Sequence, residues 1–202
     1  MPTQLSKVKV YIAGICSLIV TAGVARFSYT SLLPLMQSDA GLTEVAGGWL
    51  ATINYLGYLI GVLIVSNLNN LTHKYILYRL YLVLAVITTA SMALTTDIYL
   101  WGVLRFLSGI CTSAGFIIAS GLILKWLVHH GERGELGIHF SGIGLSIFIA
   151  AVLVEVLLRL SVSWQYQWLY LSLMAVVFTI PAWIWIPNPT RNMDSLVATN
   201  IR

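Results

Sequence analysis

Apolar residues along the chain gather into long runs that short polar segments separate. Six of these runs are close to the roughly 20 residues that a helix needs to cross about 30 Å of hydrocarbon. They cover residues 10–36, 45–67, 76–95, 98–124, 136–158 and 168–187. No run alternates apolar and polar positions in the way that a membrane-embedded strand does. The pattern predicts an all-α membrane protein with six transmembrane helices, preceded by a short N-terminal segment (residues 1–9) and followed by a polar tail (residues 188–202).

The composition indicates the same class of protein. Of the 202 residues, 58% are hydrophobic and 9% are charged, and the mean hydropathy is +0.87. A water-soluble core of this size cannot bury so much apolar surface. The net charge of +4 at pH 7 is spread over short clusters between the runs. We therefore expect the lipid bilayer as a partner and no nucleic acid, because a nucleic-acid binder gathers its basic residues in one patch or stripe.

Lysine and arginine residues fall mainly on one side of the predicted spans. The connections on that side, with both ends of the chain, carry Lys7, Lys9, Lys74, Arg79, Lys125, Arg133, Arg191 and Arg202. The connections on the other side carry Arg159 beside the acids Asp39, Glu44 and Asp97. By the positive-inside rule, we expect an integral protein of the inner (cell) membrane with both termini in the cytoplasm.

The first span also has features of a cleaved signal peptide. Lys7 and Lys9 precede an apolar stretch, and residues 23–25 (Gly-Val-Ala) resemble a cleavage site. The apolar sequence continues past Arg26 to Met36. We therefore interpret the segment as a retained helix, with signal-peptide cleavage as the alternative.

Arg105 lies inside the fourth predicted span, about 10 Å from its outer boundary at 1.5 Å per residue. A charge at the centre of a membrane helix costs about 3 kcal/mol on insertion scales, so we expect its face to point to protein or water. The same face holds Ser108, Gly109 and Thr112. The alternatives for Arg105 are a structural bond to backbone carbonyls and an outward, snorkelling conformation.

Two other spans have similar faces. Arg26 in the first span shares its face with Tyr29, and Asn54 in the second span shares its face with two glycines and Tyr58. The residues predicted to bind substrate are Arg26, Arg105, Tyr29, Asn54 and Tyr58. The residues predicted to form small-residue notches for helix packing are Gly57, Gly61, Gly109 and Ser113. Helix packing is the simpler alternative for Asn54 and both tyrosines.

The two halves of the chain resemble each other weakly. The Arg-Phe pair at residues 26–27 recurs at residues 105–106, and Ile-Asn-Tyr-Leu-Gly at 53–57 resembles Ile-His-Phe-Ser-Gly at 138–142. With three helices in each unit, the second copy is inverted relative to the first. Inverted repeats are typical of secondary transporters, whose substrate site lies near the membrane midplane where the repeats meet.

Four segments carry a resemblance to a known family. They read ARFSYTSLLPLM at residues 25–36, GWLA at 48–51, NYLGYLIG at 54–61 and RFLSG at 105–109. Together they resemble the N-terminal six-helix half of the major facilitator superfamily, and more closely its YbfB/YjiJ-type branch. The resemblance covers residues 10–187 and implies a transmembrane transporter that rocks about a midplane site.

The chain departs from that family pattern in its loops and its length. The loop at residues 66–74 lacks the acid of the superfamily's usual cytoplasmic motif, and the fifth span lacks the Gly-Pro pair of many drug/proton antiporters. The family fold has two six-helix bundles, whereas this chain has one. We expect a second bundle encoded elsewhere, a pair of identical copies, or a truncated product without transport activity of its own.

The charged residues indicate what such a site would bind. Two arginines that face one path would make a cationic centre suited to a carboxylate or another anion. Glu155, near the outer end of the fifth span, is a candidate for proton coupling, and pairing with Arg159 is its simpler interpretation. His139 is placed near the cytoplasmic boundary and is left out of the site. No nucleotide-binding loop or metal-ligand spacing is present, so no cofactor and no metal are predicted.

An enzyme and a non-transporting subunit are the other two classes that six membrane spans would suit. An intramembrane serine protease needs a Gly-x-Ser-Gly segment and a histidine on another helix. The segments around Ser108 and Ser141 lack the first glycine, and the sixth span contains no histidine, so the sequence does not predict an enzyme. A non-transporting membrane subunit, which assembles with a partner through its polar helix faces, is the alternative to a transporter.

Overall fold

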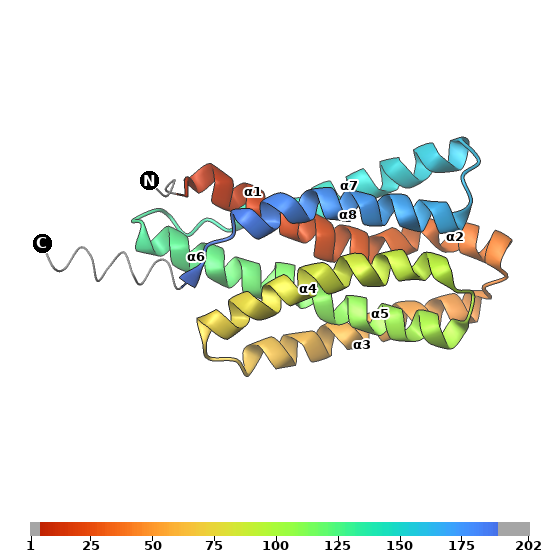
Figure 1. Cartoon of the computed structure of the whole chain (residues 1–202), viewed down its shortest axis with the longest axis horizontal. Helices are drawn as coiled ribbons and strands as arrows, with labels where there is room; N and C mark the ends of the chain where they lie inside the picture. The colour runs from red at the N-terminus through yellow and green to blue at the C-terminus, as the bar shows by residue number, and fades with distance from the viewer. Residues whose placement is uncertain (1–4, 190–202) are drawn as a thin grey trace, which may run out of the picture.

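The computed structural model describes residues 5–189, and in this part of the chain every regular element is a helix. The helices form six antiparallel spans in one bundle (Figure 1), and each span is long and apolar enough to cross a membrane. The predicted all-α, six-span membrane fold is therefore confirmed. Residues 1–4 and residues 190–202 of the predicted tail, with Arg191 and Arg202, lie outside the described residues.

The spans differ in how many helical elements they contain. The elements are α1 (Lys7–Leu18), η1 (Ile19–Phe27) and α2 (Ser28–Ala40) in the first span; α3 (Glu44–Ser66) in the second; α4 (Leu71–Ser91) and η2 (Met92–Leu94) in the third; α5 (Ile98–Ser113), η3 (Ala114–Ala119) and α6 (Ser120–His129) in the fourth; α7 (Gly137–Arg159) in the fifth; and α8 (Trp164–Ile184) in the sixth. Helix α1 begins and α8 ends at one end of the bundle, the terminal end, whereas α2 ends and α5 begins at the opposite end, the far end (Figure 1).

Short polar segments begin and end these helices. The carboxylate of Asp97 accepts the backbone N–H groups of Tyr99 and Leu100 at 2.8 and 2.9 Å, which caps the first turn of α5. The Thr43 hydroxyl caps α3 in the same way. Gly41 ends α2 in the left-handed region at φ 71°, where a residue without a side chain is favoured. The connections therefore stay short, and neighbouring spans run antiparallel.

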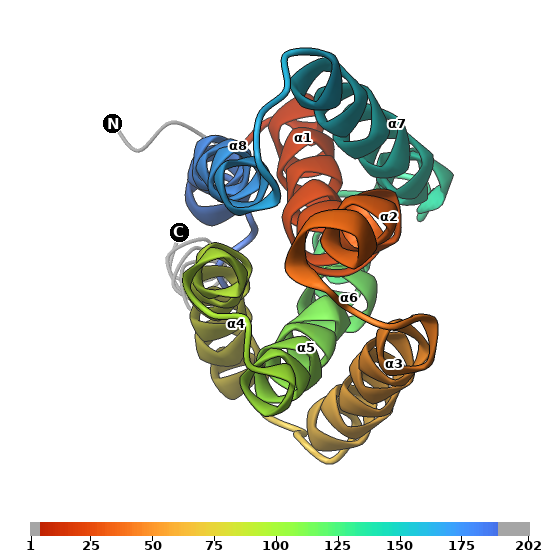
Figure 2. The same ribbon diagram turned by 90° about the vertical axis from the view of Figure 1, so that its right-hand side faces the viewer.

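The first and fourth spans form the centre of the bundle. In their most apolar windows, 78% and 67% of residues are buried, compared with 28–39% in the other four spans. The first span packs against α7 and α8, and the fourth packs against α3 and α4. Viewed from the far end, α7, α2 and α3 lie along one side of the bundle, and α4 and α8 lie on the other (Figure 2). Each central span thus packs against the two other helices of the opposite three-helix unit.

Both central spans contain a π-helical segment in their middle, η1 and η3. These segments are rich in small and β-branched residues, and most of their residues are buried. A π-helix bonds each N–H to the carbonyl five residues before it, so it interrupts the regular α-helical ladder, and such interruptions are frequent at functional sites. The faces of each central span therefore change direction near the middle of the bundle.

Candidate functional site

Arg105 lies on α5, two turns after the helix begins, and only 3% of its surface is exposed. Its guanidinium donates from Nη1 to the carbonyl of Ala25 at 3.1 Å and from Nη2 to the carbonyl of Arg26 at 3.4 Å. The group also lies 4.3 Å from the centre of the Tyr29 ring. Arg105 therefore holds the end of η1 through backbone carbonyls and an aromatic face.

Arg26 lies in the last turn of η1 and is half-buried. Its guanidinium lies 4.5 Å from the ring centre of Tyr55, 5.0 Å from that of Tyr58 and 5.5 Å from that of Phe27. Within residues 5–189, neither this arginine nor Arg105 forms an ion pair with a carboxylate. Aromatic faces attract a cation without neutralising its charge, so the positive charge of Arg26 is available to an anion.

Asn54 and Ser108 join α3 to α5 behind the arginines. The Asn54 side chain donates from Nδ2 to the Arg105 carbonyl at 2.8 Å and to the Ser108 hydroxyl at 2.9 Å, and Asn54 is 1% exposed. Thr112, one turn further along α5, donates to the carbonyl of Thr21 in η1 at 3.1 Å. This polar network ties the second, fourth and first spans together.

The two predicted tyrosines differ in their surroundings. Tyr29 is buried, and its hydroxyl donates to the carbonyl of Gly47 at 2.9 Å. Tyr58 is half-buried, and its ring meets that of Phe116 edge-on with centres 5.9 Å apart. The structure therefore brings the five predicted substrate-binding residues together, but in two layers: Arg105, Tyr29 and Asn54 are enclosed, whereas Arg26 and Tyr58 reach the surface.

Tyr55 belongs to this group and was missed by the sequence reasoning. Its ring faces Arg26, and 52% of its surface is exposed. The signal that points to it is its spacing from Tyr58, because residues at i and i+3 share one face of a helix. We call Arg26, Arg105, Tyr29, Tyr55 and Tyr58 the arginine cluster.

The predicted packing residues lie where two helix backbones approach closely. A Cβ atom added at Gly57 would meet the carbonyl oxygen of Phe106, and one added at Gly109 would meet the carbonyl oxygen of Asn54. A Cβ atom at Gly61 would lie 2.6 Å from the carbonyl oxygen of Ile110 and 2.9 Å from the hydroxyl of Ser113, which itself bonds to Ile110. These contacts fix α3 against α5 and so set the distance between Arg105 and the tyrosines of α3.

Glu155 lies apart from this group. It is exposed in the last turn of α7, and its carboxylate accepts from Arg159 Nε at 2.7 Å. That ion pair is the contact that the simpler interpretation of the sequence expected.

His139, which the sequence analysis left out of the site, is fully buried. Its Nε2 atom lies 3.0 Å from the Ser120 hydroxyl and 3.3 Å from the Gly115 carbonyl, so α7 is joined to the boundary between η3 and α6. Its position in the sequence, one turn into the span, gives no sign that the helices close over it there.

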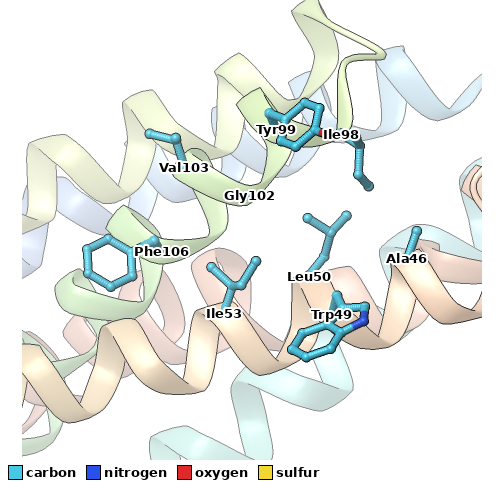
Figure 3. A pocket seen from close by; sticks show the side chains of 9 residues that line it. All are labelled: Ala46, Trp49, Leu50, Ile53, Ile98, Tyr99, Gly102, Val103 and Phe106. Atoms are coloured by element: carbon cyan, nitrogen blue, oxygen red, sulfur yellow. The ribbon is translucent and has the colours of Figure 1, made fainter.

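An apolar groove of about 580 Å³ lies between α3 and α5, near the far end. Figure 3 shows the side chains of Trp49, Ile53 and Phe106 around it. Ile53 is two residues before Tyr55, which turns it about 200° around α3. The groove thus lies on the opposite side of α3 from the arginine cluster, and its lining contains no charged residue, so it lacks the group that an anionic solute needs.

Comparison with known proteins places this geometry in a family. A family model described as an uncharacterised MFS-type transporter YbfB matches residues 18–200. The chain belongs to this family of transporters. The sequence resemblance to the YbfB-type branch of the major facilitator superfamily is therefore confirmed, and the protein is an integral membrane protein of a class that moves small solutes across lipid membranes.

One curated relative of this MFS-type chain is the uncharacterized transporter mfc1 of Schizosaccharomyces pombe. The two are 29% identical over 127 residues, which is 62% of this chain and 26% of the relative. The matched part thus spans about a quarter of the length of that relative. No solved structure matches the chain significantly.

Proposed function

We propose that this MFS-type chain forms the N-terminal half of a secondary transporter for a small anionic solute, which binds at the arginine cluster. The observation that carries the proposal is the half-buried guanidinium of Arg26, which lies against aromatic rings and pairs with no carboxylate of residues 5–189. A cation in a membrane segment is costly and marks a substrate path by default. An anion that carries an apolar group would meet both the charge and the rings.

The two arginines have different roles in this proposal. Arg26 contacts the solute, because it lies at the surface of the cluster. Arg105 is a positioning residue, since its Nη1 and Nη2 atoms bond to the carbonyls of Ala25 and Arg26 and its guanidinium lies over the Tyr29 ring. It holds the end of η1, and with it the direction in which Arg26 points.

Binding of carboxylates to the detergent-solubilised full chain tests the site directly. Acetate, benzoate and phenylacetate are each compared with the matching neutral amide at constant ionic strength, and the melting temperature is measured. A ligand at about 100 times its Kd adds about 2.7 kcal/mol to the stability, so we expect the binding carboxylate to raise the melting temperature and its amide to leave it unchanged.

Variants separate the site from unspecific charge effects. Arg26→Gln is expected to abolish the shift and Arg26→Lys to retain part of it. Arg159→Gln is the control, because Arg159 is 79% exposed in its side chain and pairs with Glu155 far from the cluster. If Arg26→Gln responds like the wild type, or if Arg159→Gln loses the response equally, then Arg26 is not the anion-binding group.

A complete pathway requires a second wall against the exposed side of Arg26 and Tyr55. We propose that a second six-helix bundle supplies it, as a separate chain or as a second copy of this one. The native mass of the solubilised chain, purified from cells that also express the neighbouring reading frames, decides between these. A mass of two copies, or of one copy with another six-span chain, would mean that a complete pathway can form and that uptake can be assayed. In that assay, unchanged uptake by the Arg26→Ala variant would exclude Arg26 from the site.

A non-transporting membrane subunit is the second candidate function. The hydrogen bonds that Arg105 and Asn54 donate to groups within the chain favour it, because such bonds stabilise a helix bundle. A monomer in the mass measurement, together with no response to any carboxylate, is the result expected for such a subunit.

A further inference from the structure

A second apolar groove runs along the outside of the bundle between α4 and α8, on the opposite side from α7, α2 and α3 (Figure 2). Its volume is about 360 Å³. The lining residues are Val83, Val86 and Ile87 from α4 and Val176, Thr179, Ile180, Trp183 and Ile184 from α8. Trp183 stands at the terminal end of the groove, one residue before α8 ends. The groove is therefore a slot parallel to the helices, closed on two sides by branched apolar side chains.

Arg79 lies at the terminal end of this slot, one turn of α4 before Val83. Its guanidinium stacks between two rings, 4.4 Å from the centre of Trp183 and 4.8 Å from that of Tyr75, and its Nη2 donates to the Trp183 carbonyl at 3.4 Å. The buried Nε atom has no hydrogen-bond partner. Because arginine carries five N–H donors in a planar fork, this residue keeps donors for another acceptor.

Two cationic residues, Arg79 and Lys9, lie near this end of the slot. Lys9 lies over the ring of Trp185, two residues after Trp183, at 5.9 Å from its centre. Within residues 5–189, no carboxylate forms an ion pair with Arg79. Tryptophan and tyrosine side chains are enriched at the level of lipid headgroups, so the rings around Arg79 mark the height at which the bilayer surface meets the bundle.

We propose that this slot binds one acyl chain of an anionic phospholipid, whose phosphate accepts from Arg79. Charge complementarity and depth both support this occupant: the cation and its rings lie at headgroup height, and the apolar slot continues from them towards the bilayer centre. Arginine binds phosphate through two parallel N–H donors. The site is separate from the arginine cluster, because α4 and α8 lie across the central spans from α3, which carries Tyr55 and Tyr58, and it does not depend on the proposed transport activity.

Native mass spectrometry of the purified full chain tests the lipid site. The chain is titrated with phosphatidylglycerol and with phosphatidylcholine of the same acyl chains, and the bound lipids are counted. One basic residue near a membrane surface favours an anionic lipid by about fivefold. We expect the wild type to retain phosphatidylglycerol at least that much better, Arg79→Gln to lose the preference, and Arg79→Lys to keep most of it.

Matched variants separate the slot from general surface charge. Arg133→Gln removes a basic residue that is 89% exposed in its side chain and lies in the connection after α6, and we expect it to keep the preference. Val83→Phe fills the slot without changing a charge and is expected to weaken retention of both lipids, whereas Val45→Phe, at an exposed position of α3, is expected to have no effect.

Three results would overturn the proposal. The first is an unchanged preference in Arg79→Gln, and the second is an equal loss in Arg133→Gln. The third is a thermal shift with glycerol phosphate as large as that with phosphatidylglycerol, which would mean that the cation binds free phosphate rather than lipid. Should Arg79→Gln fail to elute as a folded species, Val83→Phe decides: unchanged retention of phosphatidylglycerol excludes the slot.

Discussion

Two interfaces join the three-helix units at related positions: one between α3 and α5, and one between the first span and α7. They are built differently. Between α3 and α5, backbone meets backbone, because Cβ atoms at Gly57 and Gly109 would collide with carbonyl oxygens. Between the first span and α7 the backbones approach less closely, since a Cβ atom at Gly142 would lie 3.0 Å from the Cα atom of Ile15. Side chains fill two other notches of this interface: the ring of His139 lies against Gly14, and Ser146 lies against Gly23.

This difference separates a rigid pair from an adjustable one. A backbone carbonyl cannot yield to a neighbouring helix unless its own helix moves, whereas a side chain is able to change rotamer. We infer that α3 and α5 move as one body and that rearrangements within the bundle concentrate where α7 packs on the first span.

The largest effect is expected from Gly109→Ala, which places a methyl group on the Asn54 carbonyl. Overpacking in a tight core costs about 1–3 kcal/mol and occasionally more, and with backbone on both sides we expect the upper end of this range, measured by the SDS concentration that unfolds half of the protein. Gly144→Ala is the control, since nothing lies within 4 Å of its added Cβ. A Gly109→Ala chain as stable as the control would mean that the interface between α3 and α5 has room for the added methyl group.

Next in size is Arg105→Gln, compared with Arg26→Gln. Removing the buried guanidinium takes one donor from the carbonyls of Ala25 and Arg26, and we expect a total cost within about 1–3 kcal/mol and below that of Gly109→Ala. Because Arg26 is half-buried and donates to no such pair, we expect its variant to lose less than half as much in the same SDS titration. Equal losses would contradict the separate roles of positioning and contact.

A smaller effect is expected at the adjustable interface. Gly14→Ala pushes against the ends of the His139 and Ile123 side chains, so we expect it to cost less than Gly109→Ala, at about 1 kcal/mol. His139→Ala makes room for the added methyl group. A double-mutant cycle of the two is therefore expected to show a favourable coupling of about 0.5 kcal/mol or more, and strict additivity would show that His139 does not fill the notch.

The smallest effect is expected from Glu155→Gln. The side chain is 54% exposed and pairs with Arg159 four residues later, and exposed pairs of this kind contribute about 0.3–0.5 kcal/mol. We expect a shift of that size in the unfolding midpoint and none in the carboxylate response. A loss of the response would return Glu155 to the list of coupling residues.

Sequence patterns predict the coarse structure here because lipid imposes a strong rule. Apolar runs of sufficient length become helices, and a charge such as Arg105 is turned inward, so the six spans and the grouping of Arg26 with Arg105 follow from spacing. The depth of each residue does not follow: His139 looks peripheral in the sequence but is enclosed, because α1, η3 and α7 converge over it. Hydropathy also cannot show which of two polar residues has its donors used within the chain.

The π-helical segments are invisible to such patterns, because their sequences have the same small and branched residues as the α-helices around them. Tyr55 shares a face of α3 with Tyr58, but its contact also depends on where η1 directs Arg26, and the sequence of α3 does not contain that direction. The substrate-binding role of the five predicted residues stays a prediction until a ligand is measured.

The π-helical turn of η1 lets one continuous span act as two helices with independent faces. Its first part offers Gly14 to α7, and its last part offers the carbonyls of Ala25 and Arg26 to Arg105. Each residue of a helix turns the chain by about 100°, so the loss of one residue within η1 would rotate Tyr29 and everything after it away from the fourth span, while the residues before it kept their partners. The length of this nine-residue segment is thus an angular setting that aligns the two halves of the span.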